Sequence, residues 1–189
     1  MALVQRIAAL TTACALLVSA SCSASFFPDR YDRHFEDATL FLPVGTDWRL
    51  LKSQCWQESR LNPLAVSPVG AMGLCQFMPA TWQDMESRYS YLSSAWLPEQ
   101  SIIAAALYMN QLNKYWKSPR PQKDRYNLAL ASYNAGAGNL TKAQSLCDMS
   151  VYYDDIIHCL PSVTGHHSKE TIDYVQLITE KWYPMMVLE

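Results

Sequence analysis

Apolar residues recur at helical spacing in several stretches of the chain. The clearest stretch covers residues 99–116, where these positions fall on one helical face: Ile102, Ala105, Ala106, Met109, Leu112 and Trp116. Two shorter stretches, at about residues 125–134 and 168–182, show the same spacing. Their inward positions are Tyr126, Ala129, Leu130 and Tyr133 in the first, and Ile172, Val175, Ile178 and Trp182 in the second. Each pattern predicts a helix that buries one face.

A further helix is predicted from about residue 47, and it carries a carboxylate on its apolar stripe. Asp47 is a favourable N-cap residue, and the stripe continues at spacings of three and four with Trp48, Leu51 and Cys55. Glu58 is the next position on that stripe. The Asn-Pro pair at 62–63 ends the helix, because the residue before proline disfavours helical geometry. A carboxyl group on an apolar stripe loses water, which favours its protonated form and suits a general acid.

The segment after this helix has a different pattern. Residues 63–77 contain two Gly and two Pro, which predicts turns and, at most, short extended pieces. Pro79 then stands in the favoured first turn of a short helix. Gly136 and Gly138 interrupt the later helical pattern before another short helix near residues 140–146. The predicted fold class is α+β but mostly α: one helical domain with a small irregular or β lobe beside the helix that carries Glu58.

Composition agrees with a single folded domain and excludes some ligands. The chain has 189 residues, of which 50% are hydrophobic and 12% aromatic, enough for one full core and a short N-terminal extension. The net charge of −2 gives no broad basic surface for nucleic acid. Paired-His or Cys-x-x-Cys spacing is absent from the sequence, so we expect no metal site and no cofactor.

The N-terminus reads as an export signal. Arg6 is followed by an uncharged run at residues 7–21 and by small residues around Cys22, as in a secretory signal peptide. An N-terminal membrane anchor is the alternative, although the run is short for a membrane-spanning helix. Ser19 to Cys22 resembles a bacterial lipoprotein cleavage site, except that Ser19 stands where Leu is preferred. Lipidation of Cys22 and ordinary cleavage between residues 20 and 26 both stay open.

Three sequence blocks then occur in order. The first runs from Glu58 to Thr81 and reads ESRLNPLAVSPVGAMGLCQFMPAT; the second is ASYNAGAG at 131–138, and the third is ETIDYV at 170–175. Together they resemble the signature of the soluble lytic transglycosylase family, whose relatives include goose-type lysozymes, over about residues 45–183. The resemblance implies a lysozyme-like fold. It divides the chain into a signal peptide (1–22), a lead-in segment (23–42) and a lytic transglycosylase catalytic domain (43–189).

The resemblance also implies a site. Glu58 would be the catalytic acid, and the sugar cleft would be lined by Ser67, Gln76, Met78, Tyr133, Asn134 and Tyr174. Taken singly, these residues have ordinary alternatives: Ser67 as a turn residue, Met78 as core filler and the tyrosines as half-buried aromatics. A second catalytic carboxylate is not evident, since Asp84 and Glu86 fit a solvated helix face. Two positions depart from the family pattern, Cys75 and Ser101, but neither removes an acid or an amide.

The implied reaction is cleavage of peptidoglycan glycan strands without water. In the resembled family a single Glu protonates the glycosidic oxygen and then deprotonates the sugar's 6-hydroxyl, which closes a 1,6-anhydro ring. Two alternatives remain: a hydrolytic goose-type muramidase, and a non-catalytic wall-binding component of a secretion or phage-entry machine. The expected location is outside the cytoplasm, in the periplasm, on the outer membrane through a lipid anchor, or in a phage-associated particle.

The cysteines fit an exported protein. Removal of the signal peptide takes Cys14, and lipidation would occupy Cys22, which leaves four cysteines that suggest disulfides. Four cysteines allow three connectivities. Cys147 and Cys159 flank a loop rich in Asp and Tyr, and Cys55 and Cys75 lie beside the two halves of the implied site, so these two pairings are favoured. Free buried thiols are the alternative.

Overall fold

The computed structural model describes residues 25–189. The predicted signal peptide at 1–22, with Cys14 and the lipidation candidate Cys22, lies outside the described residues. Within residues 25–189, none of the helices is both long and apolar enough to cross a membrane.

The N-terminal part contains the helix predicted to carry Glu58. Helix α1 (Asp32–Ala38) and the 3₁₀ turn η1 (Thr39–Phe41) precede α2 (Trp48–Ser59). Asp47 caps α2 as predicted, because its Oδ1 accepts a hydrogen bond from the Arg49 N–H at 2.9 Å. The helix ends three residues earlier than the Asn-Pro pair suggests. Arg60 and Leu61, with φ values of 57° and 58°, turn the chain out of the helix before the proline is reached.

The predicted small lobe follows α2 and is mostly irregular. Two isolated antiparallel bridges, Val66 with Met72 and Met72 with Phe77, are its only β pairing among the described residues. Gly73 has a φ of 75°, and a Cβ there would lie 2.1 Å from the Ala95 carbonyl oxygen. The close contact and the left-handed backbone together require glycine. They hold the lobe against the segment that precedes the next long helix.

The middle of the chain forms the four helices that the patterns indicate, with shifted ends. They are α3 (Pro79–Arg88), α4 (Pro98–Tyr115), α5 (Gln122–Ala135) and α6 (Ala137–Leu146). Pro79 begins α3 as predicted. Helices α5 and α6 each start three residues before the predicted positions, because first-turn residues need no apolar side chain and leave no periodic signal.

The C-terminal part is more helical than predicted. Helix α7 (Tyr153–Cys159) occupies part of the segment that we expected to be a loop between Cys147 and Cys159. Helix α8 (Pro161–Thr164) and the 3₁₀ turn η2 (Gly165–His167) follow. The last predicted helix then runs as α9 (Ser168–Gln176), a π-helical stretch η3 (Leu177–Trp182) and α10 (Tyr183–Leu188), six residues beyond the expected end.

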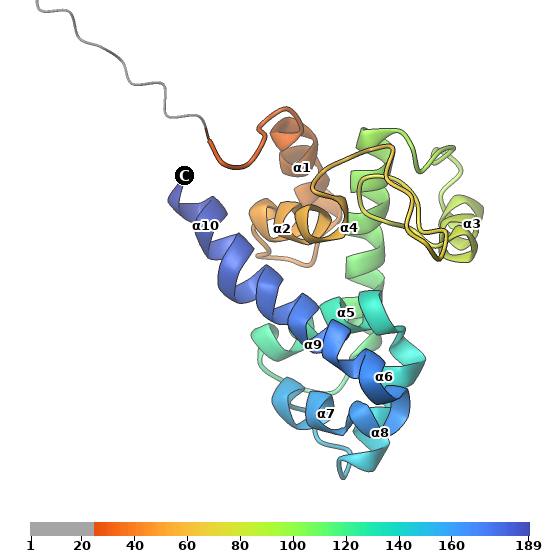
Figure 1. Cartoon of the computed structure of the whole chain (residues 1–189), viewed down its shortest axis with the longest axis vertical. Helices are drawn as coiled ribbons and strands as arrows, with labels where there is room; N and C mark the ends of the chain where they lie inside the picture. Colours follow the sequence, from red (N-terminus) through yellow and green to blue (C-terminus); the bar gives the residue numbers. More distant parts are fainter. Residues whose placement is uncertain (1–24) are drawn as a thin grey trace, which may run out of the picture.

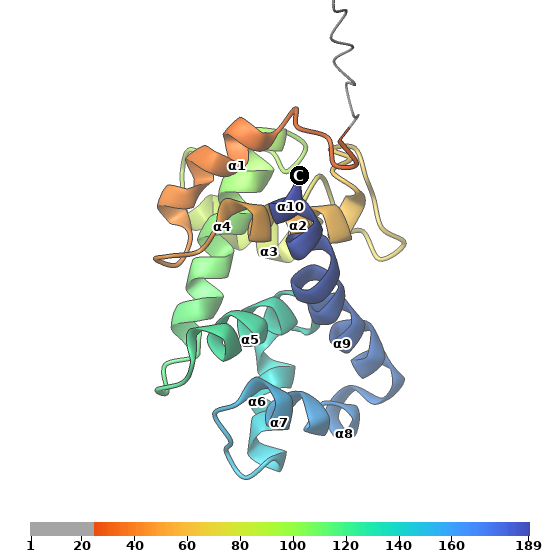
Figure 2. The ribbon, with the colours of Figure 1, turned by 90° about the vertical axis from the view of Figure 1, so that its left-hand side faces the viewer.

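The long α9–α10 segment joins the two ends of the molecule. It rises from the group formed by α6, α7 and α8 and passes beside α2 (Figure 1). In the turned view α5 lies between α4 and α9, and α10 ends close to the point where the described chain begins (Figure 2). Helix α5 packs on α4, α6 and α9, and α2 packs on η3 and α10. The last turn of α2 lies beside α9, since the Tyr174 hydroxyl is hydrogen-bonded to Glu58.

One continuous core supports this arrangement. All six inward positions predicted for residues 99–116 are buried. Phe27, Phe35, Ala38 and Leu42, from the segment before α2, are buried in the same cluster. Disulfides join Cys55 to Cys75 and Cys147 to Cys159, which confirms both favoured pairings. The mostly helical fold class is likewise confirmed.

Candidate active site

A hollow of about 530 Å³ lies where the end of α2 meets the lobe, α5 and α9. Its lining includes all seven residues predicted from the sequence: Glu58, Ser67, Gln76, Met78, Tyr133, Asn134 and Tyr174. They come from four different parts of the chain, so the fold gathers them in one place. Six further residues line the hollow that the sequence reading did not include: Gln57, Val69, Ala71, Glu170, Asp173 and Leu177.

Glu58 has the electrostatics of a general acid. It sits on the last turn of α2, partly exposed to the hollow but surrounded by protein on its other sides. Burial raises the pKa of this carboxyl from 4.5 to about 8, the hydrogen bond from Tyr174 opposes the rise, and the charge of Glu170 adds to it. With a pKa near 8, Glu58 is mostly protonated at neutral pH and can give a proton to a bound ligand.

Two tyrosine hydroxyls hold the centre of the site. The Tyr174 hydroxyl donates to Oε1 of Glu58 at 2.6 Å, and the Tyr133 hydroxyl donates to the Cys75 carbonyl at 2.7 Å. Burial raises the pKa of the Tyr174 hydroxyl well above its usual value, and the nearby Glu58 and Tyr133 add to the rise. The pKa of the Tyr133 hydroxyl is also raised, mainly by burial and then by the charge of Glu58. Both hydroxyls therefore stay protonated and act as fixed donors.

Gln76 and Ser67 organise the lobe as well as lining the hollow. The Gln76 side-chain amide donates to the carbonyls of Ala65 at 3.0 Å and Gly73 at 2.8 Å. Its nitrogen is thus used within the lobe, and only its Oε1 is left for a ligand, whereas the sequence suggested both a donor and an acceptor. Ser67 Oγ accepts from the Ala71 N–H at 2.9 Å, as a turn residue would.

Met78 is not core filler. Its side chain is 44% exposed and lines the hollow at the start of α3. The residues that fill the core beside it are Phe77 and Trp82, whose rings lie 5.4 Å apart. Met78 is therefore placed to contact a ligand through a flexible apolar surface.

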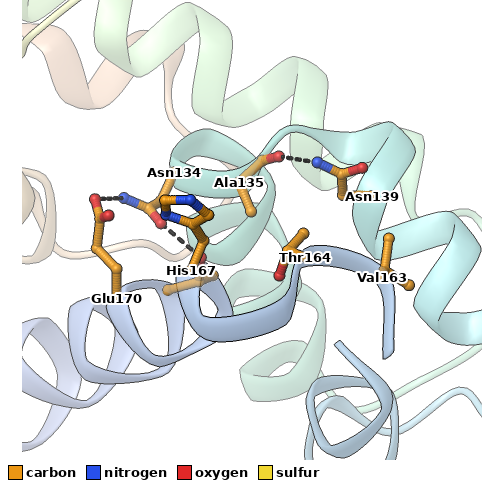
Figure 3. Close-up of a pocket in the computed structure, with 8 residues that line it drawn as sticks. Asn134, Ala135, Asn139, Val163, Thr164, His167 and Glu170 are labelled. Carbon is orange, nitrogen blue, oxygen red and sulfur yellow. Dashed lines mark hydrogen bonds between the residues drawn. The ribbon is translucent and has the colours of Figure 1, made fainter. Parts of the chain in front are cut away.

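Asn134 connects α5 to α9 at the edge of the hollow. Its Oδ1 accepts from the Thr171 hydroxyl at 2.7 Å, and its Nδ2 donates to Oε1 of Glu170 at 3.4 Å (Figure 3). Asn134 of the ASYNAGAG block is thereby in contact with the first two residues of the ETIDYV block, Glu170 and Thr171. These two bonds leave one N–H of Nδ2 and one lone pair of Oδ1 for a ligand.

The sequence reading missed two further carboxyl groups in the site, those of Glu170 and Asp173. Glu170 lines the hollow, and its charge is one cause of the raised Glu58 pKa. It stands in the third sequence block, so its position in ETIDYV was the available signal; the search for acids near Glu58 in sequence could not find it. Asp84 and Glu86 do not line this hollow. Asp84 pairs with Arg88 at 2.8 Å, and Glu86 accepts from Trp82 Nε1 at 2.6 Å.

The two departures from the family pattern touch each other. The Cys75 N–H donates to Ser101 Oγ at 3.2 Å, while the Cys75 carbonyl accepts from Tyr133 and its sulfur is bonded to Cys55. Cys75 is thus held at its backbone and its side chain, directly before Gln76. These restraints fix the lobe to the helix that carries Glu58.

No cluster of three or more His, Cys, Asp or Glu residues that could hold a metal ion occurs within residues 25–189. The adjacent rings of His166 and His167 lie 4.0 Å apart between centroids and are tilted by 37°. The hollow presents the carboxyl groups of Glu58, Glu170 and Asp173, two tyrosine hydroxyls and amide groups.

The chain is similar to known proteins in both sequence and fold. The family profile described as "Transglycosylase SLT domain" matches residues 44–149. The chain is 32% identical over 149 residues to a membrane-bound lytic murein transglycosylase F of Maricaulis maris, covering 77% of this chain and 31% of that protein. It is 36% identical over 117 residues to membrane-bound lytic murein transglycosylase F 2 of Alkalilimnicola ehrlichii, covering 62% and 24%. The chain thus spans less than a third of the length of these curated relatives.

Solved structures show the same fold. The 70 kDa soluble lytic transglycosylase SLT70 from Escherichia coli superposes with a TM-score of 0.66 at 22% identity, over 85% of this chain and 25% of that one. A complex of the 70 kDa soluble lytic transglycosylase with bulgecin A gives a TM-score of 0.67 at 21% identity, over 86% and 25%. The likeness at this level of identity concerns the fold.

Proposed function

The chain belongs to the transglycosylase SLT domain family, and from this premise we propose that it is a peptidoglycan lytic transglycosylase. It would cleave the β-1,4 bond between N-acetylmuramic acid and N-acetylglucosamine and leave 1,6-anhydro-muramic ends. The observation that carries the proposal is Glu58, a carboxyl whose burial raises its pKa to about 8 and which lines the hollow between α2, the lobe, α5 and α9.

The proposed reaction uses Glu58 twice. Its protonated carboxyl gives the proton to the glycosidic oxygen, and the bond from that oxygen to the anomeric carbon breaks. The muramic N-acetyl group stabilises the positive charge that develops at this carbon. The Glu58 carboxylate then takes the proton of the sugar's 6-hydroxyl while that oxygen bonds to the anomeric carbon. The proton count closes without water, and Glu58 returns to its starting form.

Tyr174 supports both halves of this cycle. Its hydroxyl, 2.6 Å from Oε1 of Glu58, stabilises the carboxylate after the proton has left. Without that donor a buried carboxylate would be costly, and proton transfer to the glycosidic oxygen would be less favourable. Tyr133 and Gln76 line the same hollow, where the sugar would be held.

A hydrolytic muramidase is the second candidate, and Glu170 is the observation that favours it. Two-carboxylate glycosidases place a base or nucleophile opposite the acid, and Glu170 lines the same hollow as Glu58. Digestion in ¹⁸O-labelled water separates the two reactions. Unlabelled anhydro ends support the transglycosylase, whereas label at the new muramic ends supports hydrolysis.

Glu58→Gln tests the acid itself. The amide keeps the shape and can still accept from Tyr174, but it has no proton to give, so the rate of peptidoglycan cleavage should fall by about 10²–10⁴-fold. Glu36→Gln, an exposed carboxyl on α1, is the matched control and should keep the wild-type rate. Near-wild-type cleavage by Glu58→Gln would remove Glu58 from the mechanism.

We further propose that the protein acts outside the cytoplasm, in the periplasm or at a membrane to which Cys22 attaches it through lipid. Support comes from the export pattern of residues 1–25, the two disulfides and the relatives named as membrane-bound. Metabolic labelling with a palmitate analogue, in wild type and Cys22→Ala, tests the anchor: incorporation should occur only in the wild type.

A further inference from the structure

Gln54 is a buried amide on the helix that carries Glu58. It lies in α2 one turn before Glu58, and residues four apart on a helix share one face. Its side chain is fully shielded from solvent, as are those of Leu51 and Cys55 in the same helix. An apolar residue is the usual occupant of such a position. The amide at Gln54 is therefore a feature that the packing of α2 does not require.

Neither end of the Gln54 amide has a hydrogen-bond partner. Nε2 and Oε1 are both inaccessible to solvent, and neither is bonded to another group within residues 25–189. An unpaired buried amide destabilises a fold, because the group gives up its bonds to water and gains none. Its buried neighbour Ser53 is satisfied, since the hydroxyl donates to the Arg49 carbonyl at 2.7 Å. The presence of Gln54 therefore calls for a reason other than stability.

The Gln54 amide adjoins the Tyr174 hydroxyl, which in turn donates to Oε1 of Glu58 at 2.6 Å. Burial raises the pKa of Tyr174, whereas the Gln54 amide lowers it, as an N–H group directed at the phenol oxygen does. The three residues form a row, Gln54–Tyr174–Glu58, in which each group can donate to the next. Gln54 does not line the hollow, so its influence on a bound sugar would pass through Tyr174.

We propose that Gln54 is a positioning residue for the acid, whose amide N–H donates to the Tyr174 oxygen once Glu58 has given up its proton. The inference rests on the proposed function, since it concerns the proton cycle of Glu58. A carboxylate at Glu58 draws the Tyr174 proton toward itself and leaves the phenol oxygen more negative. A donor behind that oxygen then strengthens both bonds, because hydrogen bonds in a chain polarise one another. The unpaired amide thus becomes paired at the step where a buried charge has to be stabilised.

The other titratable groups of the hollow are independent of this row. They are Glu170 and Asp173 on α9 and Tyr133 on α5, and the lining residues of the lobe carry no titratable group. A substitution of Gln54 leaves all of these side chains in place. A change in the titration of Glu58 after such a substitution therefore reports on the bond through Tyr174.

Gln54→Met tests the row while keeping the space filled. Methionine is unbranched and of similar length, but it has no N–H to donate. On peptidoglycan strands kcat should fall by about five- to tenfold with KM unchanged, as for the loss of one hydrogen bond. The alkaline limb of the kcat/KM profile should move to higher pH. The thermal midpoint should rise by about 3 °C or more, because an unpaired buried amide has been removed.

Two further variants control for indirect effects. Asn113→Leu in α4 removes another buried amide nitrogen that has no partner in the described chain, at a position outside the lining of the hollow, and should leave the rate and the pH profile as in wild type. In Tyr174→Phe protein the connecting hydroxyl is gone, so adding Gln54→Met should not move the alkaline limb further. An additional movement in this background would overturn the proposal, because Gln54 would then act on Glu58 by another route.

A titration without substrate separates this proposal from the proposed function. The ¹³C-labelled carboxyl carbon of Glu58, assigned with Glu58→Gln, is followed by NMR from pH 4 to 10 in wild type and in Gln54→Met. Glu58 should titrate at higher pH in the variant, whether or not either protein cleaves a strand. Should Gln54→Met not fold, Gln54→Leu takes its place with the same expectation. Identical Glu58 titrations in the two folded proteins would refute the role of Gln54 and leave the cleavage assay to decide the reaction.

Discussion

The raised pKa of Glu58 makes a prediction about stability that needs no substrate. In the unfolded chain this carboxyl ionises around pH 4.5, whereas in the folded protein it ionises around pH 8. Between these values the folded state holds a proton that the unfolded state has lost, so the free energy of unfolding falls as pH rises. Each pH unit in the window costs about 1.4 kcal/mol. At pH 7 the raised pKa of Glu58 therefore lowers the free energy of unfolding by about 3 kcal/mol. Partial exposure of the carboxyl to the hollow reduces this destabilisation toward about 2 kcal/mol.

Glu58→Gln removes this cost because the amide cannot ionise, while its oxygen still accepts from Tyr174. The variant should unfold at nearly the wild-type urea concentration at pH 4. It should be more stable than wild type by about 2–3 kcal/mol at pH 7, with a larger gain at pH 8. Urea titrations followed by tryptophan fluorescence at each pH measure the difference, and Glu36→Gln serves as the exposed control. Stability curves of wild type and Glu58→Gln that run parallel from pH 4 to 8 would refute the desolvated acid.

Three other substitutions probe the surroundings of Glu58. Tyr174→Phe removes a donor that favours the carboxylate, so the pKa of Glu58 should rise and the alkaline limb of the kcat/KM profile should move above its wild-type position near pH 8. Gly73→Ala should destabilise the protein by about 3 kcal/mol or more in thermal unfolding, through clash and left-handed strain, whereas Gly70→Ala, with open space around it, should cost only about 1–2 kcal/mol. Replacing Cys55 and Cys75 together by Ala should cost about 3 kcal/mol, as expected for a closed loop of 20 residues, with a drop in kcat larger than the change in KM.

Periodicity predicted the helices that are long enough for their buried positions to repeat and failed for two short ones, α1 and α7. The face of α4 was readable because its apolar residues repeat over eighteen residues against one core. Helices α1 and α7 have seven residues each, too few to show a period, and α7 begins with acidic residues that also suit a loop. Their stability comes from tertiary contacts, Phe35 in α1 and Ile156 in α7, which no local pattern contains.

Candidate residues could be named from the sequence, but their interactions could not. The three ordered blocks were enough to identify seven residues that line one hollow in the fold. The blocks do not show that the Gln76 amide nitrogen donates to two backbone carbonyls of the lobe, or that Asn134 is hydrogen-bonded to α9. Those bonds depend on the left-handed backbone at Gln76, with a φ of 53°, and on the packing of α5 against α9. Roles assigned by motif alone therefore overstate how many groups are free to meet a ligand.

Cys75 and Ser101, the two departures from the family pattern, interact in a way that the motif comparison could not predict. Each looked like an isolated departure, twenty-six positions apart in the chain, with no stated reason. In the fold the Ser101 hydroxyl receives the Cys75 N–H, and the Cys75 carbonyl receives the Tyr133 hydroxyl. The disulfide to Cys55 completes the set, so three elements hold the single residue that precedes Gln76. A covalent bond between the lobe and α2 needs its backbone fixed to match, because an unrestrained lobe would move relative to Glu58 by more than a catalytic geometry tolerates. The two departures are thus bonded to each other, and together they help to fix the residue that precedes Gln76 relative to the helix that carries Glu58.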